Sequence, residues 1–262
     1  MRLSLPLKLV LGAALLVLYA PIAVLIAFSF NAGRRVSVWQ GFSFDWYVRA
    51  ANDARLIEAF GNSLTIAAIA TVISTLLGTA TAIALWRFSF RGKSVLFGLL
   101  GVPVVVPEIC LGVALLIVFA RTGLMTALPY PASLLPIALA HVAFAFPFVA
   151  IVVRARLAGF DPRLIEASRD LGAGEWATLT RVLLPLLRPA MVAGALLAFT
   201  LSLDDFVITF FTTGPGTTTF PVLVYSMVRF SVTPEINAAS TVLIAVTLAL
   251  AALAYKFQKP ST

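Results

Sequence analysis

Residues 166–189 read EASRDLGAGEWATLTRVLLPLLRP, the most polar and most punctuated stretch of a chain that is otherwise largely apolar. The chain has 262 residues, of which 61% are hydrophobic and 11% charged, and its mean hydropathy is +1.02. Soluble domains carry about 25% charged and 45–50% apolar residues. The composition therefore predicts an all-α integral membrane protein in which this one segment is kept in water.

Six apolar stretches approach the roughly 20 residues that a helix needs to cross the bilayer core. The first follows Arg2 and Lys8, as the core of a signal peptide would. It is longer than the roughly 7–15 residues of such a core, and no cleavage site closes it before Asn31, so we expect a retained span. The six expected spans are 9–30, 61–86, 95–120, 133–153, 190–212 and 238–257.

The basic residues indicate the orientation of these spans. An even number of spans places both termini on one side of the membrane. Most of the 19 Lys and Arg residues lie in the terminal segments and in the loops after the second and fourth spans. Cytoplasmic loops carry this excess of positive charge. The pattern predicts a multi-pass membrane protein with both termini and loop 154–189 in the cytoplasm.

Several other classes of function are disfavoured by the sequence. The net charge of +8 resides in short loops between apolar runs, which is typical of a membrane protein and gives no reason to expect nucleic-acid binding. Cys110 and His141 are each the only residue of their type, so we expect no intrachain disulfide and no metal site. There is no GxxxxGK[ST] phosphate loop. We therefore expect one transmembrane domain, 1–262, that is not an enzyme and holds no cofactor.

The polar segment itself predicts a helix, a turn and a second helix. Asp161-Pro162 is a strong helix start, because Asp can cap free N–H groups and Pro tolerates the first helical position. Gly172 is suited to end that helix in the left-handed conformation. We expect a second short helix from about Glu175, limited or kinked by Pro185 and Pro189.

The spacing of this segment distinguishes between two interpretations. In one, the charges only set topology in a solvated loop. In the other, the segment has a coupling role, because its spacing resembles the EAA motif of ABC-importer permeases. Glu166-Ala167-Ser168 is followed after three residues by Gly172, after nine more by Val182, and after one more by Leu184-Pro185. Ser168 replaces the motif's third residue, Ala, and Val182 replaces Ile.

The resemblance implies the transmembrane domain of a type I ABC importer. Its coupling helix would dock in a separate ATPase dimer, which would bind ATP and Mg. The residues expected at or near that contact are Asp161, Glu166, Ala167, Ser168, Gly172, Leu184 and Pro185.

Three acids, Glu108, Asp204 and Asp205, fall inside expected spans. An acid at mid-membrane costs about 2.5–3.5 kcal/mol on insertion scales, so such residues usually face a bundle interior or an aqueous path. Adjacent helical residues point about 100° apart, so both Asp residues can face one path only if the helix is broken there. The alternative is that the acids cap or bridge broken helices. Clustered acids favour a cationic cargo, to which Tyr225 would add a cation–π contact.

Two further segments resemble the spermidine/putrescine, or polyamine, permease family of ABC importers. They are residues 202–240, which contain SLDDF and TTGPG, and the first outer loop, which contains WQGFSFDWY at 39–47 and NSL at 62–64. The resemblance implies a second related permease subunit as heterodimer partner, an ABC ATPase dimer and an extracytoplasmic substrate-binding protein. Residues 221–229 are interpreted as an outer gate, a dock for that protein or an interfacial helix.

Three alternatives stay open at this point. One is an ABC importer for another small solute, such as an opine or phosphonate compound. The second is a gradient-driven secondary carrier in which the acids relay protons or cations. The third is a membrane scaffold without transport.

Overall fold

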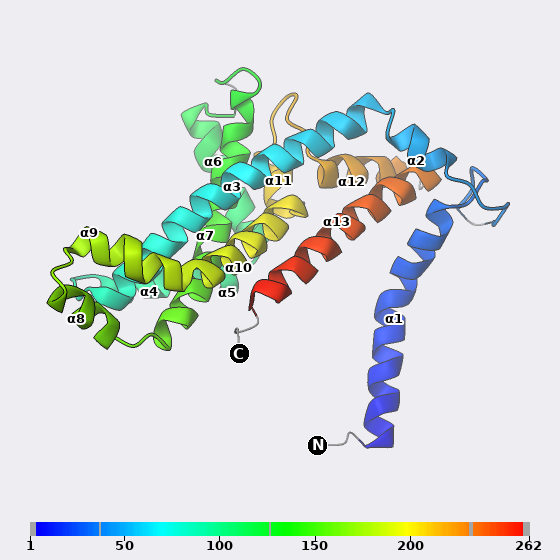
Figure 1. The fold of residues 1–262 in the computed structure, drawn as a ribbon. Helices are drawn as coiled ribbons and strands as arrows, with labels where there is room; N and C mark the ends of the chain where they lie inside the picture. Colours follow the sequence, from blue (N-terminus) through cyan, green and yellow to red (C-terminus); the bar gives the residue numbers. More distant parts are fainter. Residues whose placement is uncertain (1–3, 37, 126, 231–232, 259–262) are drawn as a thin grey trace. The chain divides into compact units, whose positions relative to one another are not determined.

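The computed structural model describes residues 4–36, 38–125, 127–230 and 233–258. Within these ranges the chain is helical, apart from loops and one isolated antiparallel bridge between Asn31 and Phe42 (Figure 1). Residues 1–58 and 223–246 form one compact unit, and residues 59–222 and 247–262 form another.

The first unit begins with a long apolar helix, α1, drawn in blue in Figure 1. Its side chains are apolar around the whole circumference, and none of its membrane-length window is buried within this chain. A helix of this kind is suited to lipid or to other membrane helices. The helices of this unit are α1 (Leu5–Ser29), α2 (Asp45–Ala50), the start of α3 (Ala54–Arg87) and most of α12 (Phe220–Phe230) and α13 (Pro234–Gln258).

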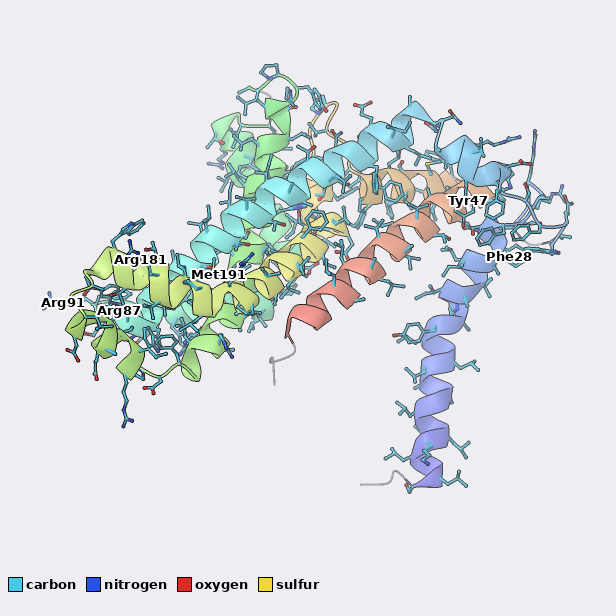
Figure 2. All side chains as sticks on the ribbon, viewed as in Figure 1. Phe28, Tyr47, Arg87, Arg91, Arg181 and Met191 are labelled. Atoms are coloured by element: carbon cyan, nitrogen blue, oxygen red, sulfur yellow. The ribbon has the colours of Figure 1, made fainter. Side chains whose placement is uncertain are left out.

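The loop between α1 and α2 folds around Asn31, whose side chain is fully buried. Its Nδ2 donates to the carbonyls of Arg35 (3.0 Å) and Val38 (2.8 Å), and its Oδ1 accepts from the backbone N–H of Gln40 (2.8 Å). Trp46 Nε1 donates to the Asn31 carbonyl at 2.8 Å. Beside it, aromatic rings pack at the end of α1, where Figure 2 labels Phe28 and Tyr47. The WQGFSFDWY segment is therefore a loop that hydrogen bonds to Asn31 hold in place and that leads into α2.

The second unit is built around α7 (Leu135–Ala158), whose span is the most buried of the candidate spans. It packs most extensively against α10, through a core that includes Val149, Val153 and Leu187. The other elements of this unit are the rest of α3, α4 (Lys93–Leu100), α5 (Val102–Val105), α6 (Glu108–Thr122), the 3-10 turn η1 (Ala132–Leu134), α8 (Arg163–Asp170), α9 (Glu175–Thr178), the π-helical turn η2 (Leu179–Leu183), α10 (Leu184–Leu203) and α11 (Val207–Thr212).

A glycine lets α3 approach α7 closely. A Cβ added to Gly78 would lie 2.7 Å from Val149 Cβ and 2.8 Å from the Phe146 carbonyl oxygen. Both distances are far below van der Waals contact, so only glycine fits at this crossing. The helix pair therefore depends on the absence of a side chain at position 78.

The spans agree with the expectation in number when one broken span is counted. Five helices are long and apolar enough to cross a membrane, and α4–α5 with α6 make a sixth that is bent by 109°. The bend falls at Val106-Pro107, where Val106 is extended. A proline disfavours the helical conformation of the residue before it. The expected third span, 95–120, is therefore present as a broken span, with its break beside a proline that favours local unwinding.

The fifth span also differs from the expected 190–212. The helical run extends from Glu175 through α9, η2 and α10 to Leu203, and then breaks before α11. Pro185 and Pro189 do not end it. A π-helical turn lies directly before Pro185 and widens the helix where a proline ring would otherwise meet the carbonyl of the preceding turn. The second helix of the polar segment and the span thus form one continuous helical run, Glu175–Leu203.

Candidate functional site

The segment before α10 has the predicted form of a helix, a turn and a second helix. Asp161 Oδ1 accepts the backbone N–H of Arg163 at 2.9 Å, so the aspartate caps α8 as expected. Gly172 has a φ of +80° just after α8 ends, which is the left-handed conformation predicted for it. Gly174 is extended and directly precedes α9. We call α8 and α9 with this turn the coupling segment.

The coupling segment has an inner and an outer face. Ser168 is buried, and its Oγ lies 3.0 Å from Thr178 Oγ1, so it fastens α8 to α9. Glu166 and Ala167 are exposed, and Leu171 is 88% exposed. The structure therefore separates the expected contact residues: Ser168 faces inward, whereas Glu166 and Ala167 face outward.

An open hollow of about 560 Å³ lies against the coupling segment. Its lining extends from α8 to the π-helical region, and four residues of the EAA-like motif, Ala167, Ser168, Gly172 and Val182, contribute to it. Leu184 is half-buried and Pro185 exposed just beyond. The hollow is lined by Leu164, Ala167, Leu171, Gly172, Arg181 and Val182, among others.

Ion pairs tie the coupling segment to the end of α3. Arg87, the last residue of α3, and Arg169 in α8 both donate to the carboxylate of Glu175, the first residue of α9. Figure 2 labels Arg87 and Arg181 at this end of the second unit. Sequence reasoning did not single out this cluster, because Arg87 and Glu175 are 88 positions apart and no motif links them.

The adjacent acids sit at the break between α10 and α11. Asp204 is exposed, whereas Asp205 is buried, with 9% of its surface exposed. Asp205 Oδ1 accepts the backbone N–H of Thr209 at 2.8 Å and its hydroxyl at 2.9 Å. Asp205 therefore caps α11. The sequence left open whether the acids face a solute path or cap broken helices, and Asp205 caps a helix in the structure.

Glu108 lies at the other break, as the first residue of α6, and is exposed. α6 packs against α11 so closely that a Cβ on Gly112 would lie 2.8 Å from Phe211 Cδ2. Glu108, Asp204 and Asp205 are within electrostatic range of one another. The three acids therefore lie at or beside two helix breaks, and their place along a solute path stays a prediction.

Tyr225 lies on α12 and is 47% exposed. It belongs to the first unit, whereas the three acids belong to the second. Residues 221–229 are helical, as their sequence suggested.

The NSL and TTGPG segments meet in the second unit. Asn62 Nδ2 donates to the Thr218 carbonyl at 3.0 Å, and Ser63 Oγ accepts the backbone N–H of Phe220 at 2.9 Å. Within the loop, Thr217 Oγ1 accepts the Gly214 N–H at 2.8 Å. The two segments that the sequence singled out are therefore parts of one structure, in which α3 holds the loop between α11 and α12.

Comparison with known proteins identifies the family. Residues 70–261 match the model of the family described as binding-protein-dependent transport system inner membrane component. The chain belongs to this family. As a member of the inner membrane component family, it is a multi-pass inner-membrane permease with a transport role.

Curated relatives are similar over most of their length. The spermidine/putrescine transport system permease protein PotC of Escherichia coli (strain K12) is 41% identical, over 89% of this chain and 86% of the relative. PotC of Haemophilus influenzae is 44% identical, over 90% of each chain. The putrescine transport system permease protein PotI of E. coli (strain K12) is 43% identical, over 87% of this chain and 81% of the relative.

Solved structures show the same fold. A bacterial ABC transporter involved in the import of the acidic polysaccharide alginate has a TM-score of 0.73 at 16% identity, covering 96% of this chain and 95% of that one. The MetNI methionine ABC transporter in an inward-facing conformation has a TM-score of 0.62 at 18% identity, covering 78% and 96%. The chain thus has the all-α transmembrane fold of ABC importer permeases.

Proposed function

We propose that this chain is one permease subunit of an ATP-driven importer that carries a small cationic solute, a polyamine such as spermidine or putrescine, into the cytoplasm. The choice of a cationic solute rests on one observation, which is that Glu108, Asp204 and Asp205 gather at two helix breaks. The relatives whose names specify spermidine and putrescine transport support the same choice.

The chemistry of the acids fits this cargo. Alkyl amines have pKa values near 10.4, so a polyamine carries several positive charges at neutral pH. Clustered carboxylates attract such a cation and repel an anion, and the attraction is stronger where water is scarce. A permease of the same fold serves in alginate import, so the fold alone does not determine the charge of the cargo.

The coupling segment suits contact with a separate ATPase. Glu166, Ala167 and Leu171 are exposed, the last two line an open hollow, and α9 continues into α10 as one helical run. In our proposal this face lies in the cytoplasm, as do both termini, and docks on an ABC ATPase dimer that binds ATP and Mg. Glu166 would form charge-assisted hydrogen bonds with that dimer.

Two further partners belong to the proposal. A second, related permease subunit would cover apolar surface such as that of α1, none of whose span is buried within this chain. An extracytoplasmic binding protein would deliver the solute. One solved neighbour is an alginate transporter in complex with a periplasmic protein that holds an alginate pentasaccharide.

Uptake in cells tests the proposal. Cells without their own polyamine importers would receive the whole operon, and uptake of labelled spermidine and putrescine would be measured. The same strain with Glu166→Lys would be compared after quantifying inserted protein. We expect uptake from the parent and none from the variant, with equal amounts in the membrane.

Each result discriminates between classes of transporter. Uptake that stops at once when the proton gradient is collapsed at constant ATP would favour a secondary carrier. An assembled complex that takes up neither amine would reject the polyamine and retain the permease family. Normal uptake by Glu166→Lys would overturn the coupling role.

A further inference from the structure

His141 connects the two sides of the α10–α11 break. Its ring, on α7, is 2% exposed. Nδ1 lies 2.6 Å from the Oγ of Ser202 in the last turn of α10, and Nε2 lies 2.8 Å from the Oγ1 of Thr209 in the first turn of α11. One side chain from a third helix therefore holds both ends of the break that contains Asp204 and Asp205.

The hydrogen-bond directions follow from the donors available. The Thr209 hydroxyl donates to Asp205 Oδ1 at 2.9 Å, so its oxygen accepts from the Nε2–H of His141. Nδ1 shares the other hydrogen bond, with the Ser202 hydroxyl. The result is a hydrogen-bonded chain that joins Ser202, His141, Thr209 and Asp205.

The network also orients the neighbouring acid. All its bonds to Asp205 use the same oxygen, Oδ1, which also lies 3.4 Å from His141 Nε2. With the Asp205 side chain held inward, the backbone at the break is fixed. Asp204, the adjacent residue, is then directed away from the interior, consistent with its exposure.

We propose that His141 is a positioning residue that fixes the break between α10 and α11, so that Asp205 is held in the protein interior and Asp204 is presented to the solute. This role rests on the proposed function for the involvement of a solute, but the orientation of Asp204 is a property of the chain itself. His141 acts through Thr209 and Asp205, without touching the solute.

A matched pair of variants separates positioning from space filling. The amide of His141→Gln reaches the place of Nε2, on the Thr209 and Asp205 side, whereas that of the shorter His141→Asn reaches only the place of Nδ1. Both are expressed with the complete operon, and assembled complex is quantified. We expect His141→Gln to retain uptake within about twofold and His141→Asn to lose about tenfold, which is the order of one buried hydrogen bond.

Thiol labelling reads the orientation of position 204 without reference to any solute. Asp204→Cys is placed in a Cys110→Ser background and labelled with a positively charged methanethiosulfonate reagent. His141→Asn should slow the labelling about tenfold, and His141→Gln should leave it unchanged. Thr209→Val, which keeps the shape and removes the hydroxyl, is expected to behave as His141→Asn does.

The outcomes test the inference independently of the cargo. If no polyamine is taken up but the labelling pattern appears, the positioning role stands and the proposed solute does not. Equal labelling in the Gln, Asn and parent chains would overturn the role of His141. Labelling in Thr209→Val at the parent rate would overturn it as well, including in the case where His141→Asn does not assemble.

Discussion

Arg87 and Glu175 join the end of a membrane-spanning helix to the start of the coupling segment's second helix. Arg169 donates to the same carboxylate from α8, so one acid holds three elements together. In the proposed coupling role, a displacement of this segment would reach α3 as well as α10. Exposed ion pairs contribute only about 0–1 kcal/mol to stability, so we expect this cluster to matter for the link between α3, α8 and α9 and not for the free energy of unfolding.

Arg87→Ala is expected to uncouple transport with little effect on folding. It removes the link between α3 and Glu175, so ATP hydrolysis by the partner should continue while uptake falls about fivefold or more, a typical size for coupling between sites. Uptake and ATP hydrolysis would be measured on the same membranes. Arg91→Ala, an exposed arginine in the following loop, is the matched control and should behave as the parent does. Equal uptake from both variants would show that the link between α3 and Glu175 has no role in coupling.

Asp204→Asn and Asp205→Asn are expected to have different effects although the residues are adjacent. Asp205 caps α11 and is buried, so its variant should lower the stability of the purified complex by about 1–3 kcal/mol. Asp204 is exposed, so its variant should leave the thermal midpoint unchanged and reduce polyamine uptake. Thermal unfolding and uptake of both variants check this. A lower thermal midpoint for Asp204→Asn alone would contradict the assignment of the structural role to Asp205 and of the solute-facing role to Asp204.

Gly78→Ala should destabilise the second unit. The added Cβ would lie 2.7 Å from Val149 Cβ and 2.8 Å from a backbone oxygen of α7, which cannot yield as a flexible side chain does. Overpacking of this kind costs about 1–3 kcal/mol. Gly61→Ala is the control, because nothing lies within 4 Å of a Cβ at that position of the same helix. The thermal midpoints of the two variants should differ, and identical midpoints would contradict the close packing of α3 on α7.

Ser63→Ala should loosen the loop between α11 and α12. The Phe220 N–H would lose its acceptor while it stays buried, at a cost of about 1–3 kcal/mol. Thr65→Ala, an exposed residue whose hydroxyl bonds its own helix, should have little effect. Limited proteolysis of the loop would compare them, and an equal cleavage rate in both would show that Ser63 does not hold it.

The sequence predicts the elements whose signals are local. The start of α8 follows from an aspartate before a proline, its end from Gly172, and the membrane spans from apolar length. The bend before α6 also has a local signal, Pro107, which favours unwinding of the span just before Glu108. In each of these cases the residue that determines the backbone lies within the segment concerned.

The remaining features depend on partners far away in the sequence. No glycine or proline lies at residues 204–206, and the break there is held by His141 from another helix. The π-helical turn that carries the chain past Pro185 has no signature in the residues themselves. The Arg87–Glu175 pair likewise depends on how α3 and α9 pack. These contacts are tertiary, so a pattern along one segment does not predict them.

In the proposed function, ATP drives a polyamine through this permease. The most direct measurement is uptake of labelled spermidine into vesicles that hold the complete purified complex, with binding protein outside and ATP with Mg inside. We predict accumulation that requires ATP and is unaffected by collapse of the proton gradient. Accumulation without ATP, or its loss on collapse of the gradient, would contradict the account.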